Sequence, residues 1–254
     1  MEYKKTPSEN DFIYGLHPII ESIKSGKEFD KILLQKGLSN DLFKELFQLI
    51  RQNEIHFQYV PVQKLDRITR KNHQGVIGFA SLISYMPLDE VITSIFESGK
   101  NPLIIILDKV TDVRNLGAIS RTAECASADA IVFPLQNSAQ LNADAVKTSA
   151  GALLKIPLCR EKNLKDSIKY LKNSGLQIVA ATEKTDTLYY STDFTKPTAI
   201  IMGSEGNGVS NEYLALSDER VAIPILGEIE SLNVASAASI LLYEAVRQRL
   251  LSAK

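Results

Sequence analysis

The chain has 254 residues, enough for one large domain or two small ones. Its 44% hydrophobic and 23% charged residues are typical of a globular protein, and the net charge of −1 gives no sign of a nucleic-acid partner. The longest apolar run, near residues 103–107, is far too short to span a membrane, and the first ten residues lack the apolar core of a signal peptide. We therefore expect a cytoplasmic protein with no membrane association.

Residues 1–85 are predicted to form a small α+β domain. Strand patterns cover residues 29–35 and 75–85, and a capped amphipathic helix pattern covers residues 40–55. This part holds 12 Lys and Arg residues against 10 Asp and Glu residues. Four of these cations fall within residues 63–74 and are candidate RNA phosphate contacts: Lys64, Arg67, Arg70 and Lys71. The alternative is that they form a solvated helix face.

Residues 86–101 are predicted to form a linker with a helix, because a proline begins this stretch and a Gly and a Pro end the helical pattern. Residues 102–254 then alternate apolar strand patterns with helical ones. The strand candidates are 103–107, 130–133, 176–181, 198–202 and 220–225. Strands that are apolar throughout are buried on both faces, so we predict an α/β domain built on a parallel sheet.

Ligands of such sheets bind beyond the carboxyl ends of the strands, where this chain has three polar loops. The first loop, "DKVTDVRNLG", contains Asn115, which can cap the following helix, and leads to Arg121 within that helix. The second loop, "GSEGNG", begins with Gly203 and carries Glu205. The third loop, "LGEIESLN", places Ser231 and Asn233 before a small-residue helix. Ser231 as a helix cap would leave Asn233 inside the first turn, with little structural use.

Each loop is ambiguous by itself: Arg121 could be a surface residue, and the glycines could form a plain turn. Two distant cysteines, Cys125 and Cys159, without CxxC spacing are expected to be reduced and packed, so we expect no metal site.

Together, "NLGAISRTAE", "GSEGNG" and "IPILGEIESLNVASAASILLYE" resemble the motifs of the SpoU/TrmH family of RNA ribose 2′-O-methyltransferases. The resemblance covers residues 100–254. "YGLHPIIESI" and "HQGVIGFA" resemble the substrate-binding domain of the RlmB-like branch, which methylates a guanosine ribose in large-subunit (23S) rRNA. One departure is Ala235, where the family usually has serine after SLNV.

The resemblance implies a trefoil-knot (SPOUT) catalytic domain over residues 102–254, a homodimer, and S-adenosylmethionine as the methyl donor. It implies that Gly203, Ile223 and Leu232 hold the cofactor. It also implies catalytic roles for Asn115, Arg121, Glu205, Ser231 and Asn233, with Arg121 as the activator of the 2′-hydroxyl. Arginine ordinarily has a pKa above about 12, so a charged Arg121 that stabilises the developing alkoxide is an alternative to a base.

Three other functions stay open at this stage. The chain could be a tRNA ribose methyltransferase of the same family, although that branch commonly lacks the first domain. It could be a catalytically silent RNA-binding protein on this fold. It could be a nicotinamide-dependent oxidoreductase, although no clean GxGxxG follows the first strand of the sheet.

Overall fold

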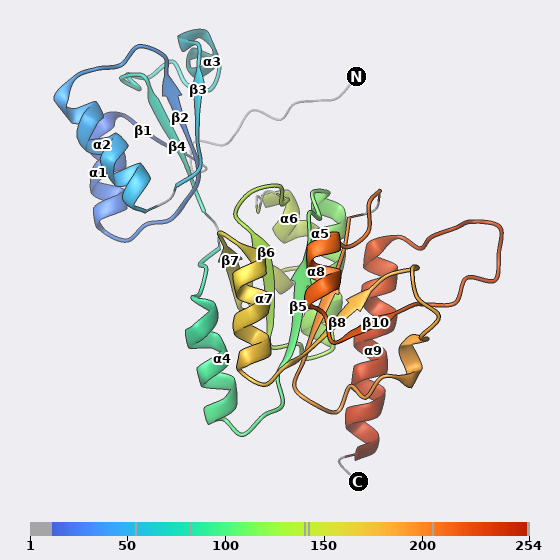
Figure 1. The fold of residues 1–254 in the computed structure, drawn as a ribbon. Helices are drawn as coiled ribbons and strands as arrows, with labels where there is room; N and C mark the ends of the chain where they lie inside the picture. Colours follow the sequence, from blue (N-terminus) through green and yellow to red (C-terminus); the bar gives the residue numbers. More distant parts are fainter. Residues whose placement is uncertain are drawn as a thin grey trace. The chain divides into compact units, whose positions relative to one another are not determined.

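The computed structural model describes residues 12–53, 55–81, 83–139, 141, 143–204 and 206–252. The chain divides into two compact units, Met1–Ser84 and Tyr85–Lys254 (Figure 1). No helix in the described ranges is long and apolar enough to cross a membrane.

The first unit has a four-stranded sheet in the order β1-β4-β2-β3. β4 is antiparallel to β1 and β2, and β2 is parallel to β3. The strands are β1 (Ile13–Tyr14), β2 (Phe29–Gln35), β3 (Phe57–Val60) and β4 (Val76–Ala80), and the helices are α1 (Leu16–Lys24), α2 (Asp41–Gln52) and α3 (Val62–Asp66). Helix α2 begins where the sequence predicts, because the Asn40 side chain accepts a hydrogen bond from the Phe43 N–H at 2.8 Å.

The two motifs of this unit that resemble the RlmB-like branch meet in space. The Val76 N–H donates to the His73 carbonyl, and the two residues between them, Gln74 and Gly75, have φ angles of 50° and 78°. This is the geometry of a type I′ turn, which is unfavourable for glutamine. The Gln74 side chain compensates by accepting the Leu16 N–H at the start of α1, at 3.0 Å. Both motifs therefore have a structural role.

The second unit has a six-stranded sheet in the order β10-β8-β9-β5-β6-β7, in which every neighbouring pair is parallel. The strands are β5 (Leu103–Leu107), β6 (Ala130–Pro134), β7 (Leu158–Glu161), β8 (Gln177–Ala181), β9 (Thr198–Met202) and β10 (Glu219–Val221). The predicted parallel sheet is confirmed. The last strand is shorter than predicted, because it ends at Val221 and not at residue 225.

Helices cover both faces of this sheet. They are α4 (Leu88–Glu97), α5 (Val113–Cys125), α6 (Ala143–Thr148), α7 (Leu164–Asn173), α8 (Asn211–Leu216) and α9 (Val234–Ser252), with 3₁₀ turns η1 (Ala152–Leu154) and η2 (Tyr189–Ser191). Helices α4, α7 and α8 share one core with alternate residues of the strands. Helices α5 and α9 pack against each other and cover the other face (Figure 1). Helix α4, predicted within a linker, thus packs on the sheet of this unit.

The carboxyl-terminal half of α9 is fixed by Arg249. Its guanidinium donates to four backbone carbonyls, those of Asn101, Pro102, Phe194 and Lys196, at 2.7 to 3.0 Å. Burial lowers the pKa of Arg249 from its ordinary value. These bonds fasten the carboxyl-terminal end of α9 to the segments that precede β5 and β9.

Candidate active site

The loops after β5 and β9 are joined by Asp108, the first residue after β5. Asp108 is only 1% exposed. Its N–H donates to the Met202 carbonyl at 2.8 Å, and its Oδ2 accepts the Ser210 N–H at 2.7 Å. The next residue, Lys109, has a φ of 57° and donates from Nζ to the Ser210 hydroxyl at 3.0 Å. The two loops are therefore held together at the carboxyl edge of the sheet.

The loop after β9 also closes on itself. Ser204 and Gly208 exchange backbone hydrogen bonds of 3.2 and 2.9 Å. A Cβ atom on Gly203 would lie 2.0 Å from the Gly208 carbonyl carbon and 2.2 Å from the Val209 nitrogen. Glycine is thus required at position 203 by the loop's own backbone. The cofactor contact that the family resemblance implies for Gly203 is not needed to explain it.

The amino-terminal ends of α5 and α9 are joined by two asparagines. Asn233 donates from Nδ2 to Asn115 Oδ1 at 2.9 Å. Asn233 Oδ1 accepts the Ala235 N–H at 2.9 Å, as an N-cap residue does. Asn233, not the alternative Ser231, therefore caps α9, which gives Asn233 a structural use that the sequence did not suggest. The expectation that Asn115 caps α5 is wrong, because Asp112 caps this helix and Asn115 lies in its first turn.

Asp112 explains the early start of α5. Its carboxylate accepts the Arg114 N–H at 2.7 Å and pairs with the Arg114 guanidinium at 2.8 Å. These bonds from Arg114 lower the pKa of Asp112 to about 2. The carboxylate therefore stays ionised, which suits a helix amino terminus.

Arg121 lies six residues after Asn115 on α5, about 9 Å farther along the helix axis. Its side chain is exposed. The guanidinium makes no hydrogen bond or ion pair with any residue that the structure describes. Glu205, the expected anchor of Arg121, lies outside the described residues.

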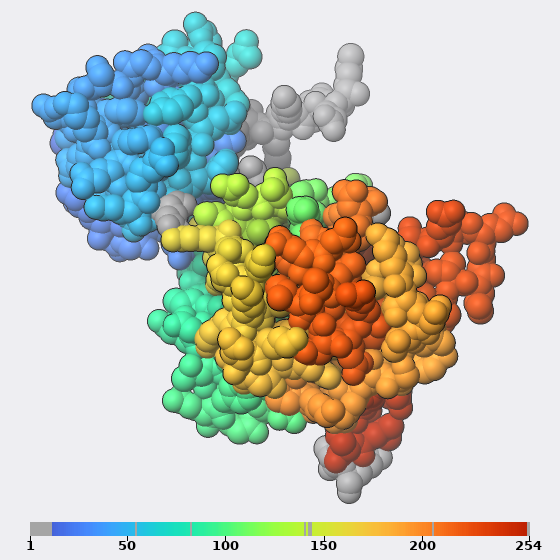
Figure 2. Space-filling model, in the orientation of Figure 1, coloured from blue at the N-terminus to red at the C-terminus, as the bar shows by residue number. Residues whose placement is uncertain are grey.

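The segment between β10 and α9 differs from the rest of the site, and we call residues 223–232 the arm. The arm projects from the body of the second unit (Figure 2). Within the described part of the chain, residues 223–232 make no hydrogen bond. Several large apolar side chains are nonetheless exposed here, with Leu226 at 98% and Ile229 at 78%. Such exposure of apolar groups and backbone together is typical of a binding segment.

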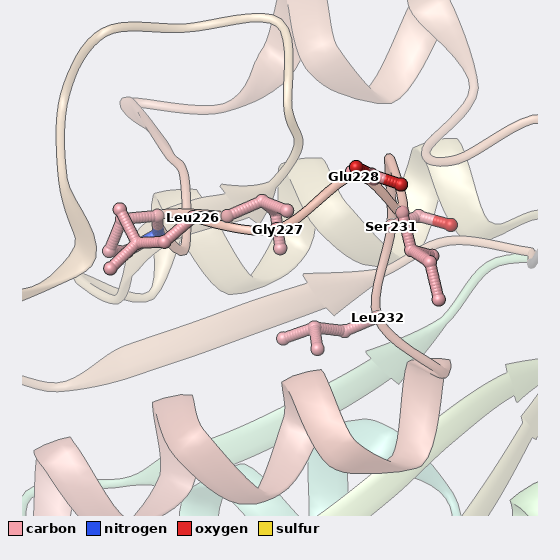
Figure 3. Close-up of a pocket in the computed structure, with 8 residues that line it drawn as sticks. Leu226, Gly227, Glu228, Ser231 and Leu232 are labelled. Atoms are coloured by element: carbon pink, nitrogen blue, oxygen red, sulfur yellow. The ribbon is translucent and has the colours of Figure 1, made fainter.

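A pocket of about 420 Å³ lies in the bend of the arm. All of its lining comes from the arm, namely Pro224, Ile225, Leu226, Gly227, Glu228, Ile229, Ser231 and Leu232. In Figure 3, Leu226 and Gly227 lie on one limb of the arm, Ser231 and Leu232 on the other, and Glu228 near the bend between them. Two residues from the sequence prediction, Ser231 and Leu232, thus line one pocket, and Ile223 begins the same segment.

The predicted basic stretch lies in the first unit, where only Lys64 belongs to a helix, the short α3. Arg67 follows this helix, and Arg70 and Lys71 lie in the loop after it. All four are exposed. The loop is held by His73, whose Nε2 lies 3.0 Å from Asp66 Oδ1 and whose Nδ1 accepts the Gly75 N–H at 3.0 Å. The four cations therefore do not share a single helix face, although all of them are exposed to solvent as that alternative expected.

Two family models match the chain. The model of the SpoU rRNA Methylase family matches residues 102–243, more than half of the chain. The model of RNA 2′-O ribose methyltransferase substrate binding matches residues 12–86. The chain belongs to the SpoU methyltransferase family.

Individual relatives agree with this assignment. A Staphylococcus saprophyticus protein described as a TrmH family tRNA/rRNA methyltransferase is 34% identical over 241 residues, which are 95% of this chain and 97% of the relative. The AdoMet-bound rRNA methyltransferase from Sinorhizobium meliloti aligns with a TM-score of 0.59 and 26% identity over 93% of this chain and 86% of its own. The A. aeolicus TrmH/SpoU tRNA modifying enzyme aligns with a TM-score of 0.55 and 29% identity over 65% of this chain and 86% of its own.

Membership of the SpoU family confirms three predictions: the two-part α/β architecture, the RNA methyltransferase activity, and S-adenosylmethionine as the methyl donor. The chemistry of the arm fits this cofactor. Leu226 and Leu232 offer apolar surface for the faces of an adenine, and the backbone groups of the arm can bond its edge. The carboxylate of Glu228 can offset the positive charge of the methionyl part.

Three residues of the candidate site were not predicted from the sequence. Asp108 joins the loops, Asp112 caps α5, and Glu228 lines the pocket. A carboxylate directly after a buried strand was an available signal for Asp108.

Cys159 is buried, which raises its pKa to about 12, whereas Cys125 is exposed and so is not packed as expected. Among the described residues, no three His, Cys, Asp or Glu side chains lie together as metal ligands do.

Proposed function

We propose that this SpoU enzyme methylates the ribose 2′-hydroxyl of a guanosine in 23S rRNA. The guanosine in 23S rRNA follows from the resemblance to the RlmB-like branch, and the observation that carries the proposed site is the Asn233–Asn115 hydrogen bond. It joins α5, which bears Arg121, to α9, which follows the arm. The proposed activating residue and the proposed cofactor segment thereby belong to one framework.

The cofactor supplies an electrophilic methyl group when it is bound. In the transfer, the ribose 2′-oxygen would bond to the methyl carbon while the carbon–sulfur bond breaks, and the electron pair of that bond would stay on sulfur. The 2′-hydroxyl proton must also leave. The chain has to align the two reacting atoms and stabilise the negative charge that grows on the 2′-oxygen.

We assign the stabilising role to Arg121. Its exposed guanidinium offers five N–H donors in a rigid plane, and none of them is bonded to a described residue. In this proposal Arg121 acts as a positive charge toward the oxygen, and water or an RNA phosphate takes the proton. An exposed side chain favours this role over that of a base, because a base would need burial to lose its charge.

The other predicted residues have supporting roles in the proposal. Asn115 and Asn233 fix the ribose between the two helix ends, and Ser231 bonds the ribose or the cofactor from the arm. Glu205 orients Arg121. Gly203 keeps the adjoining loop closed, while Ile223 and Leu232 hold the cofactor. The exposed cations Lys64, Arg67, Arg70 and Lys71 contact RNA phosphates.

Ribosomal RNA is favoured over tRNA by the extent of the structural matches. The tRNA modifying enzyme from A. aeolicus aligns with 65% of this chain, close to the share that Tyr85–Lys254 makes up. The rRNA methyltransferase from Sinorhizobium meliloti aligns with 93%. A first unit that accompanies the rRNA enzyme supports an rRNA substrate for this chain, with tRNA as the alternative.

We also propose that the enzyme is a cytoplasmic homodimer. Helix α9 has Ala235, Ala238 and Ala245 buried within the subunit, but large apolar residues elsewhere on it are exposed: Tyr243, Leu250 and Leu251. An apolar surface of this kind suits a second copy of the chain. Light scattering on the purified protein should give the mass of two chains.

The proposed reaction is tested with the purified enzyme, S-adenosylmethionine labelled in its methyl group, and total RNA from a strain that lacks the gene. We expect label in 23S rRNA at one guanosine whose 3′ linkage resists alkaline cleavage, because a methylated 2′-oxygen cannot attack the adjoining phosphate. Label confined to tRNA would show that the substrate is tRNA and not 23S rRNA. Label on a base, or no label in any RNA, would contradict the proposal.

A further inference from the structure

The two faces of the sheet in the first unit are covered unequally. Helices α1 and α2 pack on one face and form a core with Phe29, Ile32 and Leu34 of β2. The other face is covered by α3, which has five residues and packs against β2. Figure 1 shows α1 and α2 together on one side of the strands and α3 near one end of the sheet. Much of the second face is therefore left to its own side chains.

Aromatic side chains gather on this second face. The ring of Phe12 lies 6.1 Å from that of Tyr14 and 6.3 Å from that of Phe79, both in tilted orientations. Phe12 is buried, whereas Tyr14 and Phe79 are only half-buried. All three belong to one cluster with Leu33 of β2 and Ile77 of β4. Tyr14 and Phe79 therefore each have part of a ring accessible to solvent, and the rest of each ring packs against the buried residues of this cluster.

Two lysines lie at the same face. Lys31 of β2 pairs directly with Phe79 of β4, so the two side chains point to the same side of the sheet. Lys64 extends from α3, which packs over β2. Neither ammonium forms a hydrogen bond or ion pair with a described residue. Burial, and then the nearby charge of Lys64, lower the pKa of Lys31, which agrees with two cations close together at this face.

We propose that this face, defined by Tyr14, Lys31, Lys64 and Phe79, binds unpaired nucleotides of the RNA substrate. The phosphates lie at Lys31 and Lys64, and the bases stack on Tyr14 and Phe79. Cations next to partly exposed aromatic rings, on a four-stranded sheet, are a combination with which proteins bind single-stranded RNA. A protein partner with an acidic and apolar surface could pair with the lysines, but it would not need aromatic rings on which to stack. The inference rests on the proposed function only for the identity of the RNA.

The first test removes the charges. The full-length protein is titrated with a fluorescein-labelled single-stranded RNA of about 15 nucleotides, near the upper size of one binding site. In Lys31→Ala/Lys64→Ala we expect the affinity at physiological salt to fall about tenfold, and the slope of log affinity against log salt to lessen by about 1.4, because two phosphate contacts are lost. The matched control is Lys24→Ala/Lys44→Ala, which removes two lysines of α1 and α2 that pair with Glu45 and Asp41. The control should bind as the wild type does.

The second test removes the rings. Tyr14→Leu and Phe79→Leu keep an apolar side chain in the cluster. Each should lower the affinity for the RNA by roughly 5- to 100-fold, which is the contribution of one stacked base. The salt slope should stay unchanged, because no phosphate contact is lost. A merely structural role would lower the melting temperature and leave the RNA affinity of the folded protein unchanged, and that result would overturn the proposal.

The proposal and the proposed function can fail separately. Wild-type RNA affinity and salt slope in Lys31→Ala/Lys64→Ala would overturn the assignment of this face, even if the wild-type enzyme transfers methyl groups to rRNA. RNA binding that depends on these residues, in a protein that methylates no ribose, would overturn the proposed function and leave the binding face in place.

Discussion

The loop after β9 and the arm before α9 both belong to the candidate active site, but they are stabilised very differently. The loop is closed by its own backbone and fastened to β5 through Asp108 and Ser210. The arm makes no hydrogen bond within the described part of the chain and exposes Leu226 almost fully. The difference is what we expect of a preorganised framework beside the segment that we propose to bind the cofactor. Substitutions should therefore affect folding in one region and binding in the other.

The largest effect is expected from Gly203→Ala. The new Cβ would lie 2.0 Å from backbone atoms that cannot move independently, so the loop must open. Severe overpacking of this kind should lower the free energy of unfolding by about 3 kcal/mol or more. The matched control is Gly206→Ala in the same loop, where the added Cβ meets no atom within 4 Å. Urea titrations that show equal stability for the two variants would contradict the description of a self-closed loop.

The next largest effect concerns Arg121, which lies on the framework helix α5 but is exposed. Arg121→Lys keeps the charge and loses the planar fork of donors. If the fork stabilises the 2′-oxygen, single-turnover methyl transfer should slow by about 10² to 10³. Cofactor and RNA affinities, measured in parallel, should not change. Turnover near the wild-type rate in Arg121→Ala would remove Arg121 from the mechanism.

Asn233→Ala should have a smaller effect, and it should lower both the stability of the protein and the rate of methyl transfer. The variant loses the cap of α9 and the bond to Asn115. Loss of an asparagine cap costs about 1 kcal/mol of stability. Asn233→Asp is the informative companion, because it keeps the capping oxygen and loses the donor to Asn115. We expect it to retain most of the thermal stability and to lose methyl-transfer rate. Equal rates for Asn233→Asp and the wild type would show that the Asn115 bond has no part in catalysis.

The smallest effect on stability is expected in the arm. Leu226→Ser changes a side chain that is 98% exposed, so the free energy of unfolding should stay within about 0.5 kcal/mol of the wild type. Calorimetry should nonetheless show a cofactor affinity reduced about tenfold, because the apolar side chain loses its contact with the ligand. Unchanged affinity would exclude Leu226 from the cofactor site.

The sequence predicted the architecture of the second unit well, because its strands are apolar throughout and leave few alternatives to a buried parallel sheet. It also pointed to the three loops, since ligands bind at the carboxyl edge of such sheets. The helix starts were less predictable. Asp112 and Asn115 are both good caps, and only the structure shows that Asp112 is used. The use of Asn233 as a cap was missed because Ser231 is an equally good candidate by type.

Contacts between residues far apart in the sequence could not be predicted at all. The bond between Asn115 and Asn233 spans 118 positions, and that between Asp108 and Ser210 spans 102. The reason for Gly203 was likewise hidden, because the backbone that crowds it depends on how the loop closes. Similarly, periodicity carries no information on the trefoil knot, which stays a prediction from the family resemblance.

Hydrogen exchange of the backbone amides tests the contrast between loop and arm most directly. Without cofactor, the amides of residues 223–232 should exchange rapidly, whereas those of Ser204 and Gly208, which are already hydrogen-bonded, should be protected. S-adenosylmethionine at 100 times its Kd should slow exchange in the arm by up to about 100-fold and change the loop little. Rapid exchange throughout the arm at saturating cofactor would contradict the account, because the arm would then not be the cofactor's binding segment.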